Sequence, residues 1–145
     1  MRNSGTVNDA TTMQRIERLR AVPIFAELDD SALHSILGCA TEFDAPAGQV
    51  IAEAGMAGAG LFVLEEGSVV VDIPGHPREL GPGDFVGELS LLVPDTPRAA
   101  RVRTKTAARL LALSRHDFER LLSDQPKMAL GMLRVLARRI LDPAH

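Results

Sequence analysis

The sequence predicts an α+β domain in which a β-sheet unit lies between N-terminal and C-terminal helices. Two changes along the chain predict this order. Near Thr41, helical spacing of apolar residues gives way to short β-type runs separated by glycine and proline turns, and near Ser114 helical spacing returns. The chain has 145 residues, of which 46% are hydrophobic and 24% charged. That is enough for one domain with its own core.

The N-terminal segment predicts a short helix after a polar end. Residues 1–10 are polar, and we expect a flexible terminus there, followed by one domain over residues 11–145. Thr11 and Gln14 have the spacing of a capping box, which predicts that the first helix begins at Thr11. Pro23 ends it.

Three later helices are predicted from capping residues and apolar spacing. Asp29 or Asp30 can cap a helix whose apolar residues recur with a helical period. Ser114, with Asp117 three residues later, has the pattern of a second cap. A last amphipathic helix follows over Pro126–Leu141.

The middle of the chain predicts several short strands. The candidate strands are Gln49–Ala52, Leu61–Leu64, Ser68–Ile73, Ala100–Arg103 and Ala107–Leu113. Glycine and proline turns separate the strands of this region. Short strands at such spacing are typical of a β-sandwich or barrel.

Composition excludes several classes of protein. The net charge is -3, and Tyr and Trp are absent, which argues against general nucleic-acid binding. The four histidines are scattered and none has a ligand spacing, so we expect no metal site. No apolar run approaches the roughly 18–20 residues of a membrane span, and the N-terminus has no secretory pattern. The single cysteine, Cys39, fits a reducing compartment, so we expect a cytoplasmic protein.

One segment interrupts the predicted strands. Phe85–Leu92 places good helix formers directly after Gly87. The first amides of a helix are unpaired and carry partial positive charge. Gly87, Glu88 and Leu89 therefore form a candidate cradle for an anion.

A second segment supplies a cation. Arg98 follows Pro97 and precedes the small residues Ala99 and Ala100, which leave room for a phosphate beside the guanidinium. Glu88 can accept hydrogen bonds from sugar hydroxyls. Each charge alone is more often a solvated surface residue, but together they form a phosphate donor set with a ribose acceptor.

These two segments resemble the phosphate-binding cassette of cyclic nucleotide-binding domains: residues 85–91 (FVGELSL) and residues 97–102 (PRAARV). Residues 46–51 and 61–69 resemble the early strands of that family, and residues 19–28 resemble its N-terminal helices. The resemblance covers nearly the whole chain. It implies an antiparallel β-roll, a double-stranded, jelly-roll-like β-helix, with flanking helices, as in the sensor half of bacterial catabolite activator proteins.

The resemblance also implies roles for individual residues. Glu88 would bind the ribose 2′-hydroxyl, Arg98 would pair with the exocyclic phosphate oxygens, and Arg139 would contact Glu88 in the bound state. Backbone amides of the cassette would complete the phosphate site, and Val63, Val86 and Ala100 would line the pocket. The full set of expected ligand-binding residues is Val63, Val86, Gly87, Glu88, Leu89, Ser90, Arg98, Ala99, Ala100 and Arg139.

The expected function is therefore that of a regulatory sensor in signal transduction, not an enzyme, with cAMP expected before cGMP as ligand. Arg101 stands where several cGMP-binding relatives carry Thr, which favours cAMP. The family's transcription factors continue into a DNA-binding domain that is missing after Ile140, so we expect no DNA binding by this chain alone. The position matching the family's adenine contacts falls near the chain end.

Alternatives remain open at this point. The chain could be a β-roll without ligand that only mediates contacts, or a regulatory subunit of a larger assembly with an unidentified effector. A cupin-type enzyme on a similar scaffold would need a clustered His/Glu metal set, which the scattered histidines do not supply. The apolar stripe of Pro126–Leu141 further predicts a homodimer through the C-terminal helix, and no membrane partner is expected.

Overall fold

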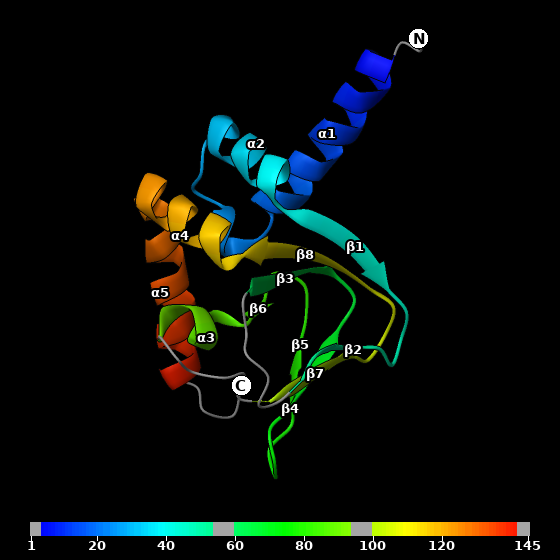
Figure 1. The fold of residues 1–145 in the computed structure, drawn as a ribbon, viewed down its shortest axis with the longest axis vertical. Helices are drawn as coiled ribbons and strands as arrows, with labels where there is room; N and C mark the ends of the chain where they lie inside the picture. The colour runs from blue at the N-terminus through cyan, green and yellow to red at the C-terminus, as the bar shows by residue number, and fades with distance from the viewer. Residues whose placement is uncertain (1–3, 54–59, 94–99, 142–145) are drawn as a thin grey trace.

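The computed structural model of the chain describes residues 4–53, 60–93 and 100–141. The strands in these ranges are β1 (Thr41–Ala45), β2 (Val50–Ala52), β3 (Gly60–Glu66), β4 (Val69–Asp72), β5 (Arg78–Leu80), β6 (Phe85–Val86), β7 (Arg101–Thr104) and β8 (Ala108–Ser114). The helices are α1 (Ser4–Arg20), the 3-10 turn η1 (Pro23–Phe25), α2 (Asp30–Cys39), α3 (Glu88–Leu92), α4 (Arg115–Asp124) and α5 (Pro126–Leu141). The helices gather along one side of the strands (Figure 1).

The described strands form two four-stranded sheets. One has the order β1-β8-β3-β6 and the other β2-β7-β4-β5, and every pair is antiparallel. β8 is central in the first sheet, since Leu110 pairs with Phe43 of β1 on one side and with Leu64 of β3 on the other. The α+β prediction is confirmed, as is the antiparallel β-roll with helices at both ends.

Strand alternation divides the core into two layers. In β8, Leu111 and Leu113 pack against the helices, whereas Leu110 and Ala108 face the interior of the roll. Large side chains from the helices complete the first layer: Leu19, Phe25, Leu33, Ile36, Phe118 and Met128. The first sheet thus has one face toward the helices and one toward the second sheet.

The predicted caps and the last helix are confirmed. The Asp29 carboxylate accepts a hydrogen bond from Ala32 N at 2.9 Å, so Asp29 rather than Asp30 caps α2. Ser114 Oγ accepts one from Asp117 N at 3.2 Å at the start of α4. α5 spans Pro126–Leu141, as the periodicity predicts.

α5 lies unusually close to η1. A Cβ added at Gly131 would lie 3.1 Å from Ile24 Cα and 3.3 Å from Ile24 O, closer than ordinary van der Waals contact. Glycine therefore permits this approach of the C-terminal helix to the backbone of the N-terminal segment.

The strand predictions missed β1, β5 and β6. β1 carries Glu42 and Asp44, and acidic residues are depleted in strands. β5 has three residues and β6 two, so neither is long enough to show a period. The five strands that we predicted are present as β2, β3, β4, β7 and β8, with shifted ends.

The start of the first helix was predicted wrongly. α1 begins at Ser4, so Thr11 lies inside the helix and does not cap it. Residues 4–10 contain no proline, and helical hydrogen bonding continues through them. A capping-box spacing identifies a residue that can cap the N-terminal end of a helix. It does not prevent the helix from starting earlier in the chain.

Candidate functional site

The junction between β6 and α3 holds the first element of the site. β6 ends at Val86, Gly87 adopts φ 96°, and α3 begins at Glu88. That backbone conformation disfavours residues with a side chain, which explains the glycine. The turn directs Glu88 inward, where its side chain is only 10% exposed.

Arg139 of α5 reaches this junction. Its Nη1 donates to Glu88 Oε2 at 2.9 Å, and its Nη2 donates to the Phe85 carbonyl oxygen at 2.9 Å. The guanidinium carbon lies 4.6 Å from the centre of the Phe85 ring, a cation–π distance. Asp84 Oδ1 lies 4.0 Å from Nη2. One side chain of the C-terminal helix is thus bonded to both sides of the Gly87 turn.

Asp84 and Phe85 are site residues that the sequence reasoning did not assign. Phe85 offers its ring and its carbonyl oxygen to the same guanidinium. The motif contained Phe85, but only the structure shows that Arg139 lies on it. No spacing rule links positions 54 residues apart.

The expected pocket-lining residues do not all share a face. Val63 pairs with Phe85, and both belong to the helix-side core. Val86 pairs with Phe62, and both pack in the interior of the roll. Strand alternation therefore separates Val63 from Val86, which corrects the expectation that the two residues line one pocket.

The remaining predicted residues are described in part. Ala100 is buried directly before β7. Leu89 and Ser90 belong to α3, and their side chains lie outside the described part. Arg98 and Ala99 lie outside the described residues altogether, so their predicted roles stay predictions.

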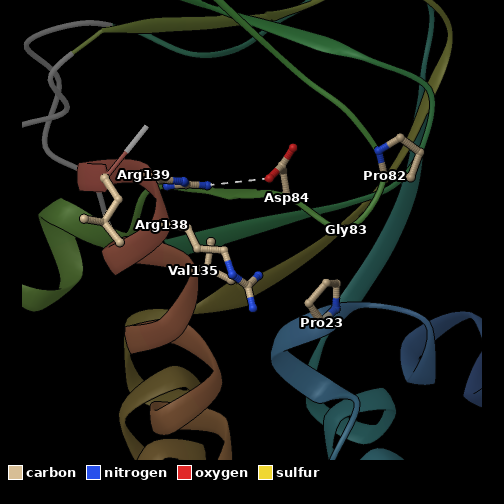
Figure 2. A pocket seen from close by; sticks show the side chains of 8 residues that line it. Pro23, Pro82, Gly83, Asp84, Val135, Arg138 and Arg139 are labelled. Carbon is tan, nitrogen blue, oxygen red and sulfur yellow. Dashed lines mark ion pairs between the residues drawn. The ribbon is translucent and has the colours of Figure 1, made fainter. Parts of the chain in front are cut away.

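A pocket of about 430 Å³ lies beside the Arg139 contact. Its walls come from η1, from the turn that precedes β6, and from the last turns of α5 (Figure 2). The side chains that line it include Pro23, Pro82, Asp84, Val135, Arg138 and Arg139. Because α5 forms one wall, the position of that helix sets the size of the pocket.

The chain matches the model of a known protein family. The family model of the cyclic nucleotide-binding domain matches residues 42–125. The chain belongs to the cyclic nucleotide-binding domain family. The matched residues contain both sheets of the β-roll, the Gly87 turn and Glu88.

Members of this family with curated names cover several kinds of regulated protein. The chain is 42% identical over 109 residues to a cyclic nucleotide-gated potassium channel of Rhizobium etli, covering 75% of this chain and 30% of the channel. It is 30% identical over 130 residues to a CRP-like cAMP-activated global transcriptional regulator of Mycobacterium tuberculosis, covering 86% of this chain and 58% of the regulator. The chain therefore spans less than two thirds of the length of each of these relatives.

A solved member of the family agrees in fold. The catabolite activator protein of Thermus thermophilus superposes with a TM-score of 0.71 at 30% identity, covering 83% of this chain and 59% of that chain. Among the described residues of the present cyclic nucleotide-binding domain, no helix is long and apolar enough to cross a bilayer. The described residues also contain no cluster of three or more His, Cys, Asp or Glu side chains arranged to hold a metal ion.

Proposed function

We propose that this domain binds cAMP in preference to cGMP and acts as a regulatory sensor whose C-terminal helix responds to the ligand. The observation that carries the proposal is the buried Glu88 carboxylate at the Gly87 turn, bonded to Arg139 of α5. The proposed ribose acceptor and the C-terminal helix are thereby joined in one contact. The cAMP-activated relative supports the choice of nucleotide.

The ligand groups follow from the chemistry of the site. Glu88 accepts a hydrogen bond from the ribose 2′-hydroxyl, and Arg98 holds the two exocyclic phosphate oxygens with its parallel N–H groups. The amides of Gly87, Leu89 and Ala99 hold the remaining phosphate lone pairs. Val86, in the roll interior, and the buried Ala100 supply apolar lining.

Coupling to α5 follows from the shared carboxylate. A carboxylate offers about four lone-pair positions, so Glu88 can accept from the ribose hydroxyl and from Arg139 together. A ligand shifts α5 only by binding its two positions with different affinity. The nucleotide favours the position in which Arg139 stays on Glu88, because that contact orders the ribose acceptor.

The output of this sensor runs through α5. Ile140 and Leu141 are 79% and 83% exposed, and Leu133 is also exposed, so the outer side of the helix is free for a second copy or an effector. We propose a homodimer through this side, acting in the cytoplasm, with no DNA binding by this chain alone. Sedimentation that shows a monomer at tens of micromolar would exclude the dimer.

Calorimetry with cAMP, cGMP and 2′-deoxy-cAMP tests the proposal. We expect tightest binding of cAMP and weak binding of the 2′-deoxy form. Glu119→Gln removes an exposed carboxylate on α4 and is the matched control for Glu88→Gln; it should bind like wild type. Absence of binding to every cyclic nucleotide would refute the sensor function and favour the ligand-free interaction module.

A further inference from the structure

Two glutamates are buried on the helix-facing side of the first sheet, away from Glu88. The side chain of Glu65 is 1% exposed and that of Glu42 is 6% exposed. Strand alternation places them there: Phe43 of β1 faces the roll interior, so Glu42 faces the helices, and Glu65 follows Val63 on the helix-facing side of β3.

The order of the strands brings the two carboxyl groups together. β1 and β3 flank β8, and a register shift between Leu64 and Glu66 leaves Glu65 as the extra residue of a bulge in β3. The strand order places the Glu42 and Glu65 carboxyl groups on one face of the sheet, and a side-chain hydrogen bond between them is among the causes that shift the pKa of each. Two carboxylates in contact offer only acceptors, so one hydrogen is missing between them.

Three arginines lie near the two carboxyl groups, but only Arg15 donates a hydrogen bond to the pair. Arg15 Nε of α1 donates to Glu42 Oε1. Arg18 Nε of α1 and Arg109 Nε of β8 lie 3.8 and 3.5 Å from Glu65 Oε1, too far or too poorly aligned to donate. Within the described part of the chain, five atoms here are buried without a hydrogen-bond partner: both of those Nε atoms, both Glu65 oxygens and Glu42 Oε2.

One further charge lies near the pair. Asp44 of β1, which is mostly exposed, accepts a hydrogen bond from Arg109 Nη1 at 3.4 Å. Arg109 is therefore shared between Asp44 and Glu65, and offsets only part of the cost of burying a second negative charge. An unpaired buried carboxylate is costly, and the group protonates instead.

The pKa shifts of the two glutamates also indicate that one of them is protonated. Burial, followed by the hydrogen bond and the negative charge of Glu42, raises the pKa of Glu65 from 4.5 to about 8. Burial alone would raise the pKa of Glu42, but hydrogen bonds from Glu65 and Arg15 lower it below its usual value. Because Arg15 donates to Glu42 and both Glu65 oxygens lack a donor, we place the proton on Glu65, which donates to Glu42.

We propose that Glu42 and Glu65 share one proton, and that this protonated pair, together with Arg15 and Arg18, clamps α1 against the β-roll. Loss of the proton leaves two buried carboxylates in contact. Their burial and repulsion outweigh the added attraction to Arg18, which lies 3.8 Å from Glu65 without a hydrogen bond, so the docking of α1 weakens. α1 packs against η1, and η1 contacts α5 at Gly131, so the clamp acts on the same helix that the ligand site engages. The domain then contains a proton-sensitive contact separate from its nucleotide site.

The sign of the pH dependence is fixed by the raised pKa of Glu65. Between pH 4.5 and about 8 the folded chain holds a proton that the unfolded chain has lost. Stability therefore falls as pH rises through this window, by up to about tenfold in the unfolding equilibrium constant per pH unit. Glu42, with its lowered pKa, acts in the opposite direction and only below its ordinary range.

Carbon-13 NMR of the glutamate Cδ atoms in the unmodified chain tests the shared proton directly. We expect the Glu65 Cδ to keep the shift of a neutral carboxyl at pH 7 and to titrate near pH 8. In Glu42→Gln the neighbouring negative charge is gone, and the Glu65 midpoint should move down. A wild-type Glu65 midpoint below pH 6 overturns the proposal, whatever cyclic nucleotides do.

Hydrogen exchange of α1 and urea unfolding between pH 6 and 9 test the clamp. Glu65→Gln places an amide where the protonated carboxyl lies, so its N–H donates to Glu42 at every pH. We expect α1 protection factors and the urea midpoint to fall with pH in wild type and to be flatter in Glu65→Gln. Glu66→Gln, an exposed carboxylate on the same strand, is the matched control and should behave like wild type. Equal slopes in wild type and Glu65→Gln would overturn the clamp.

Discussion

Glu88 and Glu65 are both buried glutamates with arginine neighbours, but only Glu88 accepts a hydrogen bond from an arginine. Arg139 donates to Glu88 at 2.9 Å, whereas the nearest arginine atoms to Glu65 lie at 3.5 and 3.8 Å without a hydrogen bond. A few tenths of an ångström and the direction of one N–H decide whether a buried carboxylate is satisfied by an arginine or needs a proton. Residue type alone does not assign the role.

The largest expected effect comes from removing one arginine at each site. Arg139→Ala leaves Glu88 buried without its donor and should lower the free energy of unfolding by about 3–5 kcal/mol. Arg18→Ala removes a half-buried side chain that makes no hydrogen bond to Glu65, so it should cost less than about 1 kcal/mol. Urea unfolding of both variants at pH 7 tests this comparison. Equal losses of unfolding free energy would show that the arginine–carboxylate distances do not determine these contributions to stability.

Next in size is the loss of the proposed phosphate-binding arginine. Arg98→Ala should weaken binding of cAMP by about 2–5 kcal/mol, because the cyclic phosphate is left half-paired in a desolvated site. Arg98→Lys should restore only part of this, since a point charge cannot reproduce two parallel hydrogen bonds. Calorimetry measures both. Wild-type affinity in Arg98→Ala would refute the phosphate assignment.

Glu88→Gln should have a smaller and more selective effect on binding. The amide is a weaker partner for the ribose hydroxyl, so cAMP should lose about 1–3 kcal/mol. Wild type should reject 2′-deoxy-cAMP, whereas Glu88→Gln should scarcely distinguish it from cAMP. The same exchange at Glu65 should leave both affinities unchanged. Equal binding of the two nucleotides by wild type would remove Glu88 from the ribose site.

The smallest effect is expected at an exposed ion pair on α5. Arg134 Nη1 donates to Glu27 at 2.8 Å, a shorter distance than that of either arginine at Glu65, but both side chains are 53% exposed. Arg134→Ala should therefore cost only about 0–1 kcal/mol, with the loss reduced further by salt. Thermal unfolding at low and high ionic strength checks this. A loss comparable to that of Arg139→Ala would mean that burial does not control these energies.

The two glutamate sites also differ in how far sequence could predict them. Glu88 lies in a contiguous motif after Gly87, and the resemblance led to Arg139, which the structure places on it. Glu42 and Glu65 lie 23 positions apart, and only the strand order β1-β8-β3 brings them together. Local periodicity could not supply this, because the prediction missed β1 and did not indicate the bulge at Glu65.

The helices and strands also differ in how far their own sequence could predict them. The start of α4 was predicted from its Ser114 cap, and both ends of α5 were predicted from its long apolar period. Elements of two or three residues, such as β6, exist because neighbouring strands supply their partners, and their own sequence carries too little information. Val63 was assigned to the pocket by motif position, and strand alternation places it on the other face.

The close approach at Gly131 has a consequence for how such a domain can be tuned. A single methyl group at this position would press on the backbone of Ile24, and the two segments would separate by a few tenths of an ångström. That displacement would be carried along α5 toward Arg139, eight residues further along the same helix. One added carbon atom can therefore change the position of α5 relative to η1 without altering the chemistry of either glutamate site.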